Sequence, residues 1–202
     1  MTVFWVLIIV VVFSFALDYG IAHMYAYDSP PHRHTPEKFG ISFEEIEIPV
    51  ADGGSLYGWW MPNSPDAPTL ILVHGWSRNL ERMMAYIRKL YPQGYNLLAF
   101  DARNHGSSTV IKHPTVGTFT EDVLAVLDYI SGNERIFSQE IGLIGLSIGG
   151  GASIAATGQD ERVRAAVTVG AMSHPIKVMR GQFAEKGVPR FVGTLLFGYM
   201  RL

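Results

Sequence analysis

The chain has 202 residues, is 48% hydrophobic and carries a formal net charge of -2, which suits one globular domain with a sizeable core. Its 16 basic residues are outnumbered by 18 acidic ones, and this balance argues against nucleic acid as a partner. The absence of cysteine excludes disulfides and thiolate metal sites but leaves the cellular compartment open. We expect neither a cofactor nor a metal.

The N-terminal segment differs in kind from the rest of the chain. Residues 3–27 are apolar, small or aromatic apart from Ser14, Asp18 and His23. A helix needs about 20 mostly apolar residues to cross a bilayer, so residues 1–27 are predicted to form a single-pass membrane anchor with Asp18 near the interface. The competing interpretations are a cleaved signal peptide, with a cleavage site that includes Ser14, and a buried core helix. No Lys or Arg precedes the apolar run, which counts against the signal peptide.

Residues 28–40 combine prolines with polar side chains and are interpreted as a linker between the membrane and the main domain. Its two histidines, His32 and His34, are expected to be solvated, because no further candidate ligands accompany them. Arg33 and Lys38 follow the apolar segment and no basic residue precedes it. The positive-inside rule therefore favours a cytoplasmic main domain.

The main domain is predicted to open with an antiparallel hairpin. Apolar residues alternate at 41 and 43 and then in the opposite phase at 46, 48 and 50, which indicates a strand with a bulge near Glu44 and Glu45. An Asp-Gly-Gly turn at residues 52–54 then leads into a second strand over residues 56–61.

After the hairpin, continuous apolar runs alternate with helical patterns. Such runs are typical of parallel strands that are buried on both faces. Apolar residues recur at helical spacing over 80–90 and 123–130, and Thr118 with Glu121 predicts a capping box for the second helix. The pattern predicts a mostly parallel, doubly wound α/β sheet. The four runs are residues 70–73, 97–100, 141–146 and 165–169.

A serine ringed by glycines follows the third of these runs, in the pattern Gly145-x-Ser147-x-Gly149. This is the pattern of a nucleophile elbow, in which a sharp turn from strand to helix holds the serine in a strained backbone conformation. Side chains at the flanking glycines would clash with the neighbouring strand or helix. The following helix would place its N-terminal N-H groups beside a developing oxyanion.

Polar residues also follow two other predicted strands, where open parallel sheets place their sites. Three motifs thus stand in order at strand ends: LILVHGW at 70–76, FDARNHGSS at 100–108 and GLSIGG at 145–150. On these motifs the sequence resembles the α/β-hydrolase family, in particular its membrane-anchored esterase-like and serine-aminopeptidase-like branch. The resemblance covers residues 41–171 and implies an α/β-hydrolase core over 41–172 that lacks the last strands.

The resemblance implies a role for each of several residues. Ser147 would be the nucleophile, and the backbone N-H groups of Trp76 and Ile148 would form the oxyanion hole. The competing interpretation of Ser147 is a helix N-cap. His74, supported by Gly75, would shape the oxyanion loop, and a general-base role for His74 is the less favoured alternative. Residues expected to brace the next loop are Asp101, Arg103 and His105, while Asp122 and Asp128 are expected to be solvated or to pair on their helix.

The remaining triad members are not found in the expected order. In the family the acid and then the histidine follow the nucleophile, and without a base a serine hydroxyl is a poor nucleophile. Here the only histidine after Ser147 is His174, and the acids are Asp160, Glu161 and Glu185. Asp160 and Glu161 are expected at the opposite end of the sheet, and Glu185 follows His174. The triad acid and base are therefore unknown.

The last segment, residues 173–202, is apolar and reads either as the start of a lid or as core exposed by truncation. We expect an N-terminal fragment of a serine hydrolase that cleaves ester, thioester or amide bonds through an acyl-enzyme on Ser147. The expected partners are a small-molecule or lipid-like acyl substrate and a membrane contacted through residues 3–27. The alternative is a non-catalytic, membrane-tethered binding or scaffold protein, and acyl transfer to an acceptor other than water shares the first chemical step.

Overall fold

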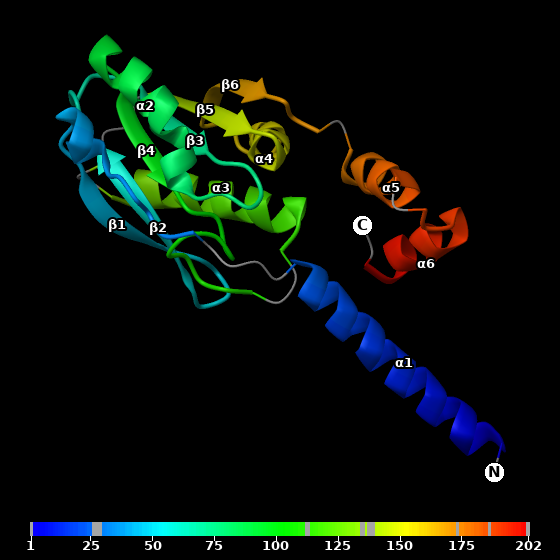
Figure 1. Cartoon of the computed structure of the whole chain (residues 1–202). Coiled ribbons are helices and arrows are strands. Elements are labelled where there is room, and N and C mark those ends of the chain that lie inside the picture. The colour runs from blue at the N-terminus through cyan, green and yellow to red at the C-terminus, as the bar shows by residue number, and fades with distance from the viewer. Residues whose placement is uncertain are drawn as a thin grey trace.

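The computed structural model describes residues 2–25, 30–111, 114–133, 136, 140–172, 174–185 and 187–200. A long N-terminal helix, α1 (Thr2–Tyr25), projects away from a domain built around one six-stranded sheet (Figure 1). Within α1, the window Val3–Gly20 has a mean hydropathy of 2.3 and none of it is buried. At 1.5 Å per residue, the 24 residues of α1 extend for about 36 Å, which is enough to cross a bilayer. The helix can therefore be a membrane anchor or a signal sequence.

The sheet has the strand order β1-β2-β4-β3-β5-β6. Its first two strands pair antiparallel as the expected hairpin, and β2 also pairs antiparallel with β4. The pairs β3·β4, β3·β5 and β5·β6 are all parallel, so the predicted mostly parallel α/β sheet is confirmed. The strands are β1 (Glu44–Pro49), β2 (Ser55–Met61), β3 (Thr69–Val73), β4 (Asn96–Phe100), β5 (Ile141–Leu146) and β6 (Val163–Val169).

The predicted bulge in the first strand is wrong. The β1·β2 register runs without a break from Glu44 opposite Trp60 to Pro49 opposite Ser55. The phase change in the sequence marks the start of the strand, because the residues before Glu44 lie outside the sheet. Ile41 is buried there in a different part of the core from Ile48, so the two apolar stripes serve two different contacts.

Helices cover both faces of the sheet and divide its core in two. On one face, α3 and α4 pack on residues such as Ile71, Phe100 and Leu143. On the other, α2 and the preceding turn pack on residues such as Leu72, Leu97 and Ile144. The helices that follow α1 are η1 (Pro36–Phe39), η2 (Leu80–Met83), α2 (Met84–Leu90), η3 (Tyr91–Gln93), α3 (Val116–Gly132), α4 (Ile148–Thr157), α5 (Pro175–Glu185) and α6 (Arg190–Met200).

The capping box of α3 lies one turn earlier than predicted. Thr115 is the N-cap, its hydroxyl accepts from the Thr118 N-H, and the Thr118 hydroxyl accepts from the Thr115 N-H. Thr118 is thus the third residue of the helix rather than its cap. Glu121 instead forms an ion pair with an arginine that is described below.

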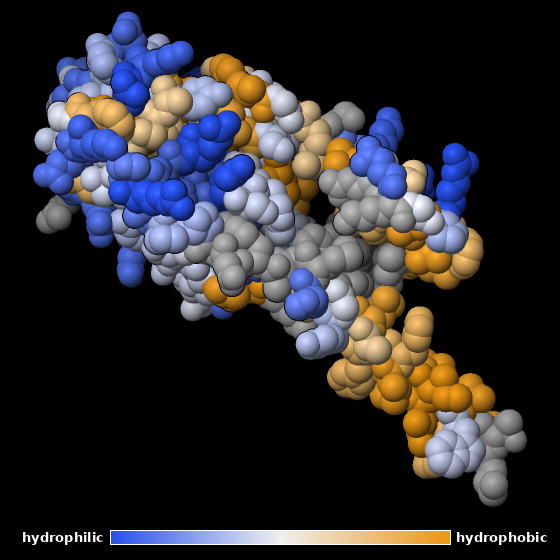
Figure 2. Space-filling view, in the orientation of Figure 1, coloured by the Kyte–Doolittle hydropathy of each residue, from blue (hydrophilic) through white to orange (hydrophobic). Residues whose placement is uncertain are grey.

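The last strand of the described sheet is not buried on both faces, contrary to expectation. In β6 only Val163 is buried, while Val167 and Val169 are 58% and 49% exposed. Among the described strands, β6 pairs with β5 alone and so lies at an edge. Figure 2 shows apolar surface at the place that β6 occupies in Figure 1, and along α1.

The segment expected to be a solvated linker lies against the domain instead. We call residues 30–39 the N-terminal strap. The Pro30 carbonyl accepts from the Asn79 side chain at 2.8 Å, His32 pairs with Asp101, and His34 pairs with Glu81. The expectation of a solvated histidine is therefore wrong for His32, whose imidazole packs against the buried Asp101 carboxylate, whereas His34 is exposed as expected and pairs with Glu81 at the surface.

Candidate active site

Ser147 stands at the point where β5 ends and α4 begins, with φ 53° and ψ -116°. Every other residue from 141 to 150 is buried, but Ser147 is exposed. Its N-H donates to the Val169 carbonyl at 2.9 Å, and its own carbonyl accepts from the Gly151 N-H at 3.1 Å. A non-glycine residue at positive φ costs roughly 1–3 kcal/mol and persists only where its surroundings enforce it. The turn therefore presents the serine hydroxyl at the edge of the sheet.

The glycines on either side of Ser147 are required by close backbone approach, as predicted. A Cβ on Gly145 would lie 2.5 Å from both the Gly149 carbonyl and the Ser153 hydroxyl. A Cβ on Gly149 would lie 2.7 Å from the Val73 carbonyl and would also overlap the His74 carbonyl. Strand β5, helix α4 and the end of β3 thus meet with no room for side chains at these two positions.

The competing interpretation of Ser147 as a helix N-cap holds for its position but not for its side chain. Ser147 occupies the N-cap position of α4, but its side chain makes no capping hydrogen bond. Among the described residues, none forms a hydrogen bond with its hydroxyl. The first N-H groups of a helix have no acceptor within the helix, so those at the start of α4 remain available beside the serine.

The loop after β3 lies directly against this turn. A Cβ on Gly75 would be 3.4 Å from the Leu146 carbonyl and 3.4 Å from the Ser147 Cβ. Trp76 follows it, and its ring meets the His105 ring edge-on at 5.0 Å between centroids. The structure thus brings Gly75, the residue before Trp76, next to Ser147, the residue before Ile148.

The imidazole of His74 is occupied at both nitrogens. Its Nε2 accepts from the Ala102 N-H at 3.0 Å, and its Nδ1 donates to the Gly75 carbonyl at 2.7 Å. The ring is fully buried, and burial lowers the pKa of His74 despite the nearby Asp101 carboxylate and the Gly75 carbonyl, which raise it. A neutral ring with neither nitrogen open shapes the loop and has no site from which to take the Ser147 proton.

His105 braces the same loop from the other side. Its Nε2 accepts from the Ser77 N-H at 3.2 Å and its Nδ1 donates to the Arg103 carbonyl at 2.9 Å. Burial, with the adjacent His74, lowers the pKa of His105 to about 4. Among the described non-glycine residues, positive φ occurs at Ser77, Asn104 and Ser147, and all three stand in turns at the edge of the sheet where β3, β4 and β5 end. We call this the carboxyl edge.

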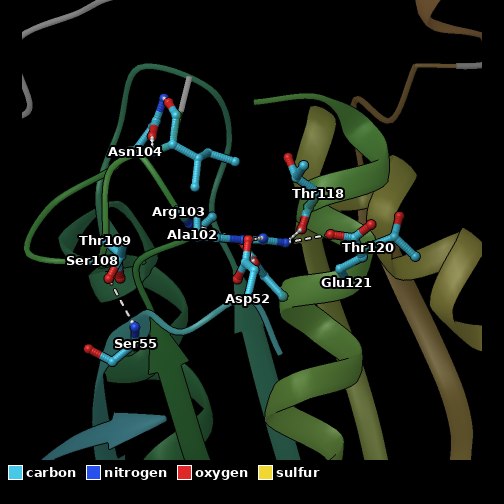
Figure 3. Close-up of polar contacts among 12 residues, drawn as sticks. Asp52, Ser55, Ala102, Arg103, Asn104, Ser108, Thr109, Thr118, Thr120 and Glu121 are labelled. Carbon is cyan, nitrogen blue, oxygen red and sulfur yellow. Dashed lines mark hydrogen bonds and ion pairs between the residues drawn. The ribbon is translucent and has the colours of Figure 1, made fainter. Parts of the chain in front are cut away.

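Arg103 ties the loop after β4 to two distant elements (Figure 3). Its Nε donates to Asp122 at 2.5 Å, and the Arg103 N-H donates to the same carboxylate at 2.8 Å. Its Nη1 reaches Asp52 in the hairpin turn at 2.8 Å, and its Nη2 reaches Glu121 at 2.6 Å. The predicted bracing role of Arg103 agrees with these contacts. The expectation that Asp122 is solvated is wrong, because its side chain is 0% exposed.

Among the described residues, no hydrogen bond joins the Ser147 side chain to the acids or the histidine that follow it. Asp160 pairs with Arg162 at 2.5 Å and precedes β6, whose start lies beside Ile141 at the opposite end of β5. Six strand residues, or roughly 20 Å, separate that level from Ser147. Arg162 also pairs with Asp128, which is 74% exposed, so Asp128 is solvated as expected but its partner lies outside its own helix. His174 is exposed, and its Nδ1 accepts from the Ile176 N-H.

Other candidate sites in the described part of the chain are weaker. A hollow of about 780 Å³ lies between the hairpin turn and α3, lined by residues such as Asp52, Arg103 and Tyr129, and it does not include Ser147. No group of three or more His, Asp or Glu side chains that could hold a metal ion occurs among the described residues. The serine turn with its two flanking loops is therefore the candidate active site.

Comparisons with known proteins agree with this geometry. Residues 68–195 match a family model described as alpha/beta hydrolase fold. An uncharacterized 31.7 kDa protein of Escherichia coli, encoded in the traX-finO intergenic region, is 31% identical over 131 residues, which are 63% of this chain and 46% of that protein. The thiohydrolase aneE of Aspergillus aculeatus is 25% identical over 158 residues, 77% of this chain and 48% of aneE.

A solved structure, the esterase Pf2001 of Pyrococcus furiosus, is also similar. It superposes with a TM-score of 0.69 at 26% identity, over 86% of this chain and 70% of that one. The chain spans about half the length of the curated relatives that it matches.

Proposed function

Because the chain belongs to the alpha/beta hydrolase fold family, we propose that its gene product is a serine hydrolase that forms an acyl-enzyme on Ser147. The observation that carries this proposal is the exposed, positive-φ serine whose hydroxyl has no partner among the described residues. A strained position of this kind is maintained where its strain serves a function, and a serine used only as a cap would have bonded to the helix.

The proposed chemistry has two halves. The Ser147 hydroxyl attacks the substrate carbonyl carbon, its proton passes to a base, and the carbonyl π electrons move onto the oxygen. The backbone N-H groups of Trp76 and Ile148 stabilise that oxyanion, and each such donor is typically worth about 10²- to 10³-fold in rate. Collapse expels the alcohol, thiol or amine, and water then releases the acid by the same steps.

This chemistry requires a base. Among the described residues, none is placed beside Ser147 to serve as one. Both nitrogens of His74 already take part in hydrogen bonds, and His174 makes no hydrogen bond with the Ser147 side chain. The activity is therefore proposed for the complete gene product, in which a base must reach the serine.

The substrate class is proposed from the relatives and from α1. The similar proteins Pf2001 and aneE are named as an esterase and a thiohydrolase, which supports an ester or thioester substrate. An amide substrate or transfer to an acceptor other than water uses the same acyl-enzyme. The apolar, exposed α1 supports a membrane anchor, which would favour a lipid-like acyl group, and Arg33 and Lys38 after it favour a domain on the cytoplasmic side.

The second candidate is a tethered binding or scaffold protein without catalysis. The observation in its favour is that no described residue acts as a base for Ser147. It predicts that the fold binds acyl compounds or a protein partner but turns over neither esters nor thioesters.

Labelling with a fluorophosphonate probe tests the first candidate against the second. The complete gene product should be labelled, and Ser147→Ala should abolish labelling. Ser153→Ala is the matched control, because Ser153 lies on the same helix and its buried hydroxyl donates to the Gly149 carbonyl. Equal labelling of wild type and Ser147→Ala, or no labelling of either, would rule out the acyl-enzyme proposal.

A further inference from the structure

The N-terminal strap makes an ion pair with a buried carboxylate that follows β4, one of the strands that end at the carboxyl edge. His32 Nε2 lies 2.8 Å from the Asp101 Oδ2, and the two side chains are 13% and 0% exposed. The second pair of the strap, His34 with Glu81, is also 2.8 Å long but far more open, with 44% of the His34 side chain exposed. The His32 contact is therefore a packed one, and the His34 contact is a surface one.

The ring of His32 is held in place by aromatic neighbours as well as by its hydrogen bond. It stacks on Tyr57 of β2 with 5.1 Å between ring centroids and 21° between planes, and it also contacts Trp59 at 5.6 Å. This packing fixes the ring plane, so that Nε2 points at Asp101 in one orientation only.

Asp101 is a junction between the strap and two loops of the carboxyl edge. Besides His32, its Oδ2 accepts from the Ser107 N-H at 2.9 Å, which closes the loop after β4. Its Oδ1 accepts from the Leu80 N-H at 2.7 Å, which fixes the far end of the loop that carries Trp76. One buried carboxylate therefore makes hydrogen bonds with the strap and with both of these loops.

A second path leads from the same junction to the candidate oxyanion donors. Ala102, the next residue after Asp101, donates its N-H to His74. His74 in turn donates to the Gly75 carbonyl, next to Trp76. A shift of Asp101 is thus transmitted to both ends of the loop from His74 to Leu80.

We propose that His32 is a positioning residue of the active site, which holds the oxyanion loop in place through Asp101. The proposal rests on the function proposed above, because only then does the Trp76 N-H act on a substrate. It makes the segment that follows α1 part of the site's scaffold. Release of the strap should leave Ser147 in place but move the Trp76 N-H away from the developing oxyanion, where a displacement of about 1 Å can cost up to 10²-fold in rate.

The charges around His32 give the contact a pH dependence. Burial lowers the pKa of His32, but the hydrogen bond and charge of Asp101, with Glu81 and Glu45, outweigh it, and the net effect raises the pKa above its ordinary value of 6.5. The groups facing His32 from neighbouring elements are Asp101, Glu81, Glu45, Tyr57 and His74. The charged contact is complete below about pH 6.5 and weakens as the pH rises through the raised pKa.

The ring of Trp76 can report this coupling without any catalysis. We would incorporate 5-fluorotryptophan into the complete gene product in lipid nanodiscs and follow the Trp76 ¹⁹F resonance from pH 6 to pH 9, assigned by its loss in Trp76→Phe. We expect this resonance to shift with the same midpoint pH as the titration of the His32 imidazole, which is measured by NMR. His105, which contacts Trp76, has a pKa of about 4 and does not titrate in this range.

Variants separate His32 from the rest of the strap. In His32→Gln the amide keeps a donor but no charge, so the Trp76 titration should disappear. In the control His34→Gln it should remain. His32→Ala should slow fluorophosphonate labelling of Ser147 about tenfold at pH 6.5, and His32→Gln should recover most of that rate.

The two proposals fail in different ways. A Trp76 resonance that is flat in wild type, or that still titrates in His32→Gln, overturns the positioning role even where Ser147 is labelled normally. If Ser147 is not labelled in any variant while the Trp76 resonance of the wild type still titrates, the hydrolase proposal is overturned, and with it the catalytic consequence of the strap.

Discussion

The backbone of Gly149 lies so close to that of Val73 that a Cβ on the glycine would stand 2.7 Å from the Val73 carbonyl oxygen. The two residues belong to the first turn of α4 and the end of β3, so this contact locks the serine turn against the loop that follows β3.

Replacing Gly149 by alanine should therefore destabilise the domain. The Cβ meets backbone rather than a side chain that could rotate away, so β3 and α4 must separate. We expect a loss of about 1–3 kcal/mol in the free energy of unfolding, measured by urea denaturation.

Gly151→Ala is the matched control, two residues further along the same helix. A Cβ there would make ordinary contacts, the nearest at 3.7 Å from the Met172 side chain. Alanine in a helix should stabilise the protein by roughly 0.5–1 kcal/mol relative to glycine. Similar effects of the two substitutions would contradict the close approach at Gly149.

Replacing Arg103 by methionine should unfold the loop after β4. The change leaves the fully buried Asp122 carboxylate without its cation, which typically costs about 3–5 kcal/mol. Glu121→Gln removes a partner of the same arginine, but its side chain is 65% exposed, so the expected loss is under about 1 kcal/mol. Chemical denaturation of both variants checks this, and equal losses would mean that burial does not set the strength of these pairs.

Much of this architecture could be predicted from residue patterns. The hairpin, the parallel strands and the serine turn each have a local signature in the sequence. The glycines at 145 and 149 likewise predicted that a side chain at either position would clash. Asp122 was misplaced, although it stands on the same helical face as Phe119 and Val126, and that apolar stripe indicated burial. The helix cap was misplaced because Thr118 and Glu121 match the usual Ser/Thr-x-x-Glu/Gln pattern, whereas the true pair, Thr115 and Thr118, has a threonine in the second position.

The strap could not have been found in the same way. His32 and Asp101 are 69 residues apart, and a contact between two polar side chains at that separation leaves no periodic trace in the sequence. The prolines around His32 indicated only that the segment is extended. What joins the two residues is the shape of β2, where Tyr57 offers a ring for the imidazole to stack on, and that surface exists only after folding.

Acid should destabilise the fold through His105. The pKa of this buried histidine is lowered to about 4 in the folded state, so the unfolded chain binds more protons between about pH 6.5 and pH 4. The contribution of His105 to the unfolding free energy should thus fall across that window, by up to about 3 kcal/mol. The buried His74 acts in the same direction, and the buried Asp122, whose pKa is raised to about 6, acts in the opposite one. Denaturation curves at several pH values test this. His105→Gln should be less stable at pH 7 but should flatten the slope, and an unchanged slope would reject the assignment.

A single charge in α1 distinguishes a membrane anchor from the alternatives. Val11 lies near the middle of the apolar window and is exposed, and arginine at the centre of a spanning helix costs roughly 2.5–3.5 kcal/mol in insertion. We expect Val11→Arg to move the protein from the carbonate-resistant membrane fraction to the soluble fraction, whereas the control Val11→Leu stays in the membrane. A mature protein whose N-terminus, read by mass spectrometry, begins after residue 16 would instead show a cleaved signal sequence. Retention of Val11→Arg in the membrane would mean that another part of the chain holds it there.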